Sequence, residues 1–171
     1  GAATEGGRTP SIWDTFAAIP GKTFNGETGA VACDHYHRFA EDVKLIKSLG
    51  LQSYRFSISW SRLLPQGIDE VPNGAAIDFY SKLIDALLAE GISPLVTLYH
   101  WDLPQCLEDK YGGWLGKGIV DDFEHYAKIC FSSFGDKVKS WISINEPWCA
   151  SVLGYVSGEH APGRSSAPQT E

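Results

Sequence analysis

The sequence predicts an α/β fold with a parallel sheet, and two observations carry this prediction. Amphipathic helical periodicity alternates three times with short runs of strand-forming residues along the 171-residue chain. Parallel strands need long crossover connections, which helices supply, so such repeated units indicate a parallel sheet. Polar residues also recur near the predicted strands, since Arg55, His100 and Asn145 are spaced 45 residues apart.

This repeat is typical of a (β/α)8 barrel, in which polar groups at the carboxyl ends of the strands converge on one site. In an open sheet the same residues would line a crevice at one switch point. A closed barrel needs eight strands and roughly 200 residues at the very least, so 171 residues supply about half of one. We therefore expect a partial TIM barrel, roughly strands 2 to 4 with their helices, truncated at both ends; residues 164–171 have polar loop composition.

Residues 34–49 form the first predicted helix, because apolar side chains recur there at three- and four-residue steps. Asp34 can cap its start and Gly50 can end it. Residues 52–60 then alternate strictly between two faces, which predicts a strand with Arg55 on its polar side. A buried guanidinium there needs a carboxylate or several carbonyls as partners, so Arg55 serves either a site or a structural ion pair.

The pattern repeats twice more. Residues 76–88 and 120–134 have helical periodicity and are each followed by a glycine. Residues 94–99 and 139–144 are short apolar runs that predict the next two strands.

Composition narrows the possible partners. The net charge of −7 disfavours nucleic acid, and no apolar stretch approaches the roughly 20 residues that span a bilayer. We expect neither nucleic acid nor a membrane as partner.

The four cysteines are widely scattered, at Cys33, Cys106, Cys130 and Cys149. Without CxxC or zinc-like spacing they favour reduced thiols and a cytoplasmic protein. Cys33, His35 and His37 spread around a helix start, so we expect no metal.

The strongest chemical motif is at the end of the last predicted strand. Pro147 cannot extend a ladder and favours extended geometry at Glu146, so the strand should stop with this carboxyl at the rim. Beside Trp148, in a partly dry pocket, the neutral acid would be favoured, as a general acid requires. The alternative is an exposed loop glutamate.

His100 and Trp101 follow the middle strand, and Asp102 comes next. Their imidazole, indole and carboxylate offer hydrogen bonds, and an aromatic face can stack on a pyranose, which makes this a candidate sugar platform. The alternative is a buried His and Trp satisfied by the backbone.

Five segments together resemble the family 1 glycoside hydrolases, the β-glucosidases and their relatives, nearest to fungal intracellular β-glucosidases. These are residues 10–16, 33–36, 54–62, 97–105 and 145–148. The resemblance implies a (β/α)8 barrel, retention of anomeric configuration and no cofactor. It implies that Glu146 is the general acid/base and that Arg55 orients the nucleophile.

The substrate contacts are also implied by the resemblance. His100 and Trp101 would bind the sugar, Asn145 would bind its 2-hydroxyl, and Trp148 would border the aglycone. The family's nucleophile, in a Thr-Glu-Asn-Gly type motif, has no counterpart here.

Residues 1–171 would thus be the N-terminal portion of one catalytic domain. The implied activity is hydrolysis of β-glucosides or cello-oligosaccharides by the completed barrel. A non-catalytic half-barrel that binds sugar or pairs with a complementary chain stays open, as do a β-galactosidase and a 6-phospho-β-glucosidase. The oligomeric state is also open.

Overall fold

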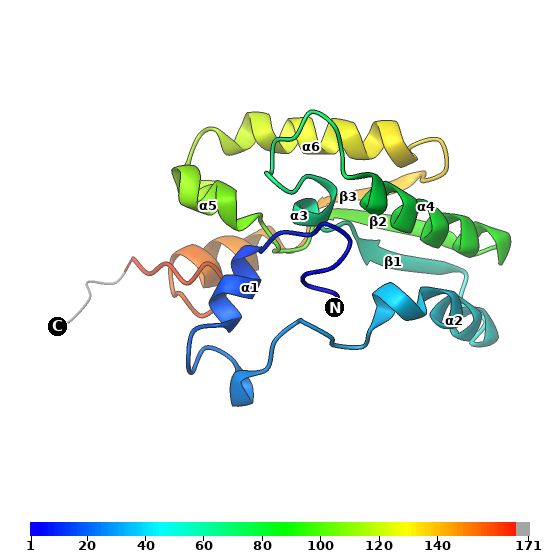
Figure 1. Cartoon of the computed structure of the whole chain (residues 1–171), viewed down its shortest axis with the longest axis horizontal. Coiled ribbons are helices and arrows are strands. Elements are labelled where there is room, and N and C mark those ends of the chain that lie inside the picture. Colours follow the sequence, from blue (N-terminus) through cyan, green and yellow to red (C-terminus); the bar gives the residue numbers. More distant parts are fainter. Residues whose placement is uncertain (167–171) are drawn as a thin grey trace.

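The computed structural model describes residues 1–166 and contains a parallel three-stranded sheet (Figure 1). The strands are β1 (Ser53–Ser57), β2 (Ser93–Tyr99) and β3 (Ser140–Ile144). They lie in the order β1-β2-β3, and both pairs are parallel. The α/β class and the three helix–strand units are therefore confirmed.

A long helix precedes each strand. These helices are α2 (His35–Ser48), α4 (Gly74–Ala89) and α6 (Ile119–Phe134). In Figure 1, α4 and α6 cover one side of the sheet, while α2 lies near β1 and packs against α4. Their apolar stripes account for the expected periodicity.

Shorter elements connect these units. They are α1 (Ile12–Ala17), a 3₁₀ turn (Phe24–Gly26), α3 (Trp60–Leu63), α5 (Gln105–Tyr111), a second 3₁₀ turn (Gly113–Leu115) and a π-helical turn (Cys149–Leu153). Among residues 1–166, no helix is both long enough and apolar enough to cross a membrane.

The first strand is shorter than its alternation predicts. β1 ends at Ser57, and the backbone N–H of Ser59 donates to the Tyr80 hydroxyl at 2.7 Å instead of to a neighbouring strand. Trp60 then begins α3, where it is fully buried and stacks on Tyr126 with ring centroids 4.6 Å apart. The alternation of apolar and polar residues continues past the end of β1 because Ile58 and Trp60 are buried in the core beyond the strand.

Asp34 also differs from expectation. It precedes α2 with φ 56°, but its side chain makes no capping hydrogen bond to the helix backbone. Its carboxylate instead lies 2.6 Å from Nδ1 of His37.

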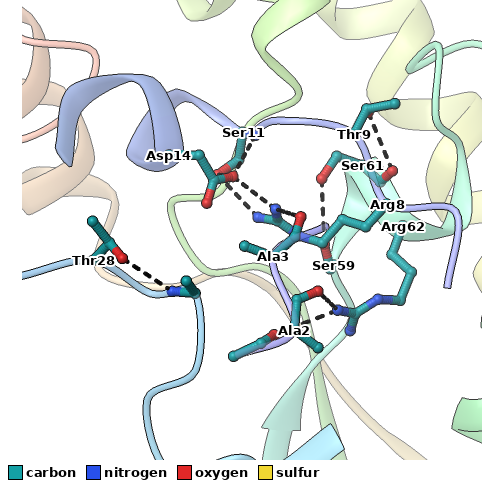
Figure 2. A network of polar contacts seen from close by, with 12 residues as sticks. Ala2, Ala3, Arg8, Thr9, Ser11, Asp14, Thr28, Ser59, Ser61 and Arg62 are labelled. Carbon is teal, nitrogen blue, oxygen red and sulfur yellow. Dashed lines mark hydrogen bonds and ion pairs between the residues drawn. The ribbon is translucent and has the colours of Figure 1, made fainter. Parts of the chain in front are cut away.

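The N-terminal segment is fixed beside the carboxyl ends of β1 and β2. Arg8 forms an ion pair with Asp14 at 2.7 Å and donates to Ser59 Oγ, while Arg62 donates to the carbonyl of Ala2 (Figure 2). Ile12 N–H donates to the Leu103 carbonyl just beyond β2, at 2.8 Å. These contacts hold the first helix against the edge where the candidate site residues gather.

Candidate active site

His100 and Asn145 lie side by side at the carboxyl ends of their strands. Tyr99 pairs with Ile144 in the register of β2 and β3, so the next residues are level, as the 45-residue spacing predicts. Arg55 is not at this level, because it pairs with Leu95 in the middle of the sheet. The equal spacing of Arg55 was therefore misleading, and only the length of its side chain brings it to the site.

The Asn145 amide connects the site. Arg55 has only donors, so the amide oxygen Oδ1 must face it and accepts from Nη2. This leaves Nδ2 to donate to Nε2 of His100, 3.1 Å away, which places the His100 proton on Nδ1. Burial, followed by the Arg55 charge, lowers the pKa of His100 and favours that neutral form.

Arg55 has neutral partners in this structure. Besides Asn145, its Nε donates to Oγ1 of Thr97 at 3.1 Å. The residue is exposed, and no ion pair of Arg55 occurs within residues 1–166, so the expectation of a buried guanidinium is wrong here. Because Nε and one N–H of Nη2 are engaged, both N–H groups of Nη1 and the second N–H of Nη2 remain for a further acceptor.

Trp101 is held by the same asparagine. Its indole Nε1 donates to the Asn145 carbonyl at 2.8 Å, and its ring lies 5.5 Å from that of His100. The backbone of Trp101 has φ 76°, in the left-handed region that favours glycine. Strain of this kind clusters at functional sites.

Glu146 differs from the sequence expectation in two ways. Its φ is 43°, so the chain turns sharply at this residue instead of staying extended before Pro147. It is also exposed, and within the described chain no partly dry pocket encloses it. Its Oε2 accepts from the Cys149 thiol at 3.2 Å. The carboxyl therefore faces open space beside Asn145.

Trp148 stands apart from this network. Its side chain is 65% exposed, and none of the hydrogen bonds found in residues 1–166 joins it to the other site residues. It immediately precedes the π-helical turn, a rare conformation that is frequent at functional sites.

Asp102 follows His100 by two residues. Both residues line an open cavity of about 530 Å³, together with Arg8, Asp14 and Trp13. Its Oδ1 is buried and has no hydrogen-bond partner among the described residues. Burial raises the pKa of Asp102 to about 7, although the Arg8 charge opposes that rise.

The candidate metal ligands point elsewhere. His35 contacts Asp42 at 2.6 Å, and His37 contacts Asp34 and Glu5. Within residues 1–166, no three His, Cys, Asp or Glu side chains group in a way that could hold a metal ion.

Sequence reasoning assigned no role to Thr97 and Cys149, which both contact site residues. After Ser93 at the start of β2, Thr97 is the next residue of that strand with an aliphatic hydroxyl. This isolated hydroxyl among apolar residues could have marked Thr97 as a candidate site residue. Cys149 begins the π-helical turn three residues after Glu146, and this spacing brings its thiol within reach of the carboxylate.

Comparisons with known proteins give one consistent match. The family model described as "Glycosyl hydrolase family 1" matches residues 1–170. Beta-glucosidase 1B of Phanerodontia chrysosporium is 60% identical over 168 residues, which cover 97% of this chain and 31% of that protein.

Solved structures agree. A rice β-glucosidase mutant in a covalent complex with Glc has a TM-score of 0.95 and 57% identity, over 97% of this chain and 34% of that one. A β-glucosidase from Thermotoga maritima in complex with castanospermine has a TM-score of 0.94 and 50% identity, over 97% and 37%. The chain spans about a third of the length of the curated relatives it matches.

Proposed function

The chain belongs to glycosyl hydrolase family 1, and from this premise we propose that the whole protein containing it is a retaining β-glucosidase. Its substrates would be β-glucosides or short cello-oligosaccharides, from which it would release glucose without a cofactor. The observation that carries this proposal is the position of Glu146, which follows β3 directly after the amide that joins Arg55 and His100. A donor network next to an open carboxyl suits a neutral, hydroxyl-rich ligand.

We propose that β1, β2 and β3 are strands 2 to 4 of the barrel and that residues 1–171 are the N-terminal portion of one catalytic domain. The coverage of about a third of each relative is compatible with three strands of an eight-stranded barrel, while the N-terminal placement rests on the resemblance of the motifs. A parallel sheet whose helices each precede a strand is compatible with it.

In the proposed mechanism, Glu146 is the general acid/base. It donates its proton to the glycosidic oxygen while a second carboxylate attacks the anomeric carbon and forms a glycosyl-enzyme. Glu146 then removes a proton from the water that releases the sugar. The two carboxyl groups must lie about 5 to 5.5 Å apart, and the second would come from outside this chain.

The remaining site residues receive binding roles. The Asn145 amide would bind the 2-hydroxyl, while His100 and the Trp101 ring would contact the sugar in subsite −1. Arg55 would use its free Nη1 to hold the attacking carboxylate ionised. Trp148, exposed next to Glu146, would form a wall for the aglycone.

We also propose a cytoplasmic location. All four cysteines are free in the structure, which supports a reducing compartment.

The test is hydrolysis of 4-nitrophenyl β-glucoside and of cellobiose by the full-length protein and two variants. Glu146→Gln should abolish most cellobiose hydrolysis but spare more of the aryl glucoside rate, because nitrophenolate needs little protonation to leave. Glu159→Gln, which changes an exposed carboxylate on the nearby loop, is the matched control. Equal cellobiose hydrolysis by both variants would remove Glu146 from this role.

A further inference from the structure

We propose that Thr97 is a positioning residue for this reaction, whose hydroxyl holds Arg55 and, through Arg55, the Asn145 amide in the orientation that receives the sugar. The inference rests on the proposed function and deepens it. Thr97 lies in β2 with no exposed surface, and its Oγ1 accepts from Arg55 Nε at 3.1 Å. Its neighbours Val96 and Leu98 are buried apolar residues, so this hydroxyl is isolated in the strand.

The hydrogen bond matters because of how Arg55 is built. A guanidinium is planar, and Nε and Nη2 lie on one of its edges. Thr97 holds Nε while Asn145 holds Nη2, so two hydrogen bonds fix the plane. If the Thr97 hydrogen bond is removed, one contact fewer fixes the plane, and the long Arg55 side chain can rotate more freely about the contacts that remain.

The effect then reaches the sugar-facing amide. Arg55 forces Oδ1 of Asn145 toward itself, which directs Nδ2 toward Nε2 of His100. If the guanidinium turns away, the amide keeps only its hydrogen bond to His100, so its orientation about the last side-chain bond is less firmly fixed. Thr97 thereby acts on the proposed 2-hydroxyl contact without touching the substrate.

The experiment compares Thr97→Val with Thr97→Ser in the full-length protein. Valine keeps the branched shape but removes the hydroxyl, whereas serine keeps the hydroxyl and removes a buried methyl. The substrates are 4-nitrophenyl β-glucoside and its 2-deoxy analogue. Hydrogen bonds to the 2-hydroxyl strengthen in the transition state, so Thr97→Val should lower kcat/KM for the glucoside about tenfold, mainly through kcat.

Two comparisons separate positioning from stability. The 2-deoxy substrate has no 2-hydroxyl, so its penalty from Thr97→Val should be at least threefold smaller, as in a double-mutant cycle. Thr97→Ser should restore most of the glucoside rate. Tyr126→Phe is the matched control, because it removes a buried hydroxyl that bonds the carbonyls of Ile58 and Leu98 in the same region of the sheet.

The outcomes are distinct. Equal losses on both substrates, or serine as poor as valine, would show a purely structural role and overturn the inference. If wild type hydrolyses neither β-glucoside, the proposed function itself fails and the inference with it. Wild-type turnover combined with an unaffected Thr97→Val variant would refute the positioning role alone.

Discussion

Glu108 anchors the loop that follows the site, and replacing it with glutamine should loosen that loop. The carboxylate is 7% exposed; Oε1 lies 2.6 Å from Nε of Arg164, and Oε2 accepts from the Tyr155 hydroxyl at 3.2 Å. A charge-assisted hydrogen bond contributes about 1.5 to 3 kcal/mol. Because Arg164 is 45% exposed and partly screened, we expect a loss of about 1.5 kcal/mol, at the low end of that range.

Hydrogen-exchange mass spectrometry on the full-length protein measures this locally. The Arg164 N–H donates to the Gly154 carbonyl at 3.0 Å, so its exchange reports opening of the loop. A loss of about 1.5 kcal/mol should speed exchange over residues 154–166 about tenfold in Glu108→Gln.

The control uses the same substitution at an exposed ion pair of nearly equal length. Glu124 lies 2.7 Å from Lys128, with both side chains more than 60% exposed. Amide hydrogen exchange around this exposed ion pair should stay within about twofold of wild type in the Glu124→Gln variant. If both variants exchange alike, burial does not set the strength of the Glu108 ion pair and the reasoning above is wrong.

Two further predictions concern Asp102 and Gly113. Burial raises the folded-state pKa of Asp102 from 3.8 to about 7, so the folded protein should lose stability relative to the unfolded chain as pH rises from 4 to 7. The Asp102→Asn variant cannot ionise at this position. The melting temperature of wild type, minus that of the variant, should therefore fall as pH rises from 4 to 7. A constant difference would contradict the raised pKa of Asp102. Gly113 has φ 55°, and a Cβ there would overlap Glu108 Oε2 and lie 2.7 Å from Leu103 Cδ2. Gly113→Ala should therefore lower the melting temperature more than Gly26→Ala, which has φ 69° and nothing within 4 Å, and equal losses would show that only the backbone angle matters.

Much of the fold follows from periodicity. The predicted helix over 120–134 differs from α6 by a single residue at its start, because one face of that helix packs on the core. The end of β1 was less predictable. Ile58 and Trp60 are buried in the core beyond the strand, and alternating burial looks the same in a sequence whether a strand or a turn produces it.

The site was predictable in its members but not in its geometry. Asn145 and His100 follow paired strands, so their proximity could be expected from topology. That Arg55 reaches them from mid-strand depends on the length of its side chain and on its hydrogen bond to Thr97, and no local pattern encodes this pairing. The turn at Glu146 opposes the local preference set by Pro147, and such conflicts are imposed by tertiary structure.

The left-handed backbone at Trp101 and Glu146 has a consequence for stability. Each residue costs about 1 kcal/mol or more relative to a glycine in the same conformation. Stability alone would favour glycine at both positions, since glycine adopts this conformation without the steric cost of a Cβ. Glycine or asparagine at these positions would therefore gain heat resistance at the cost of the indole and the carboxyl group that the proposed function requires.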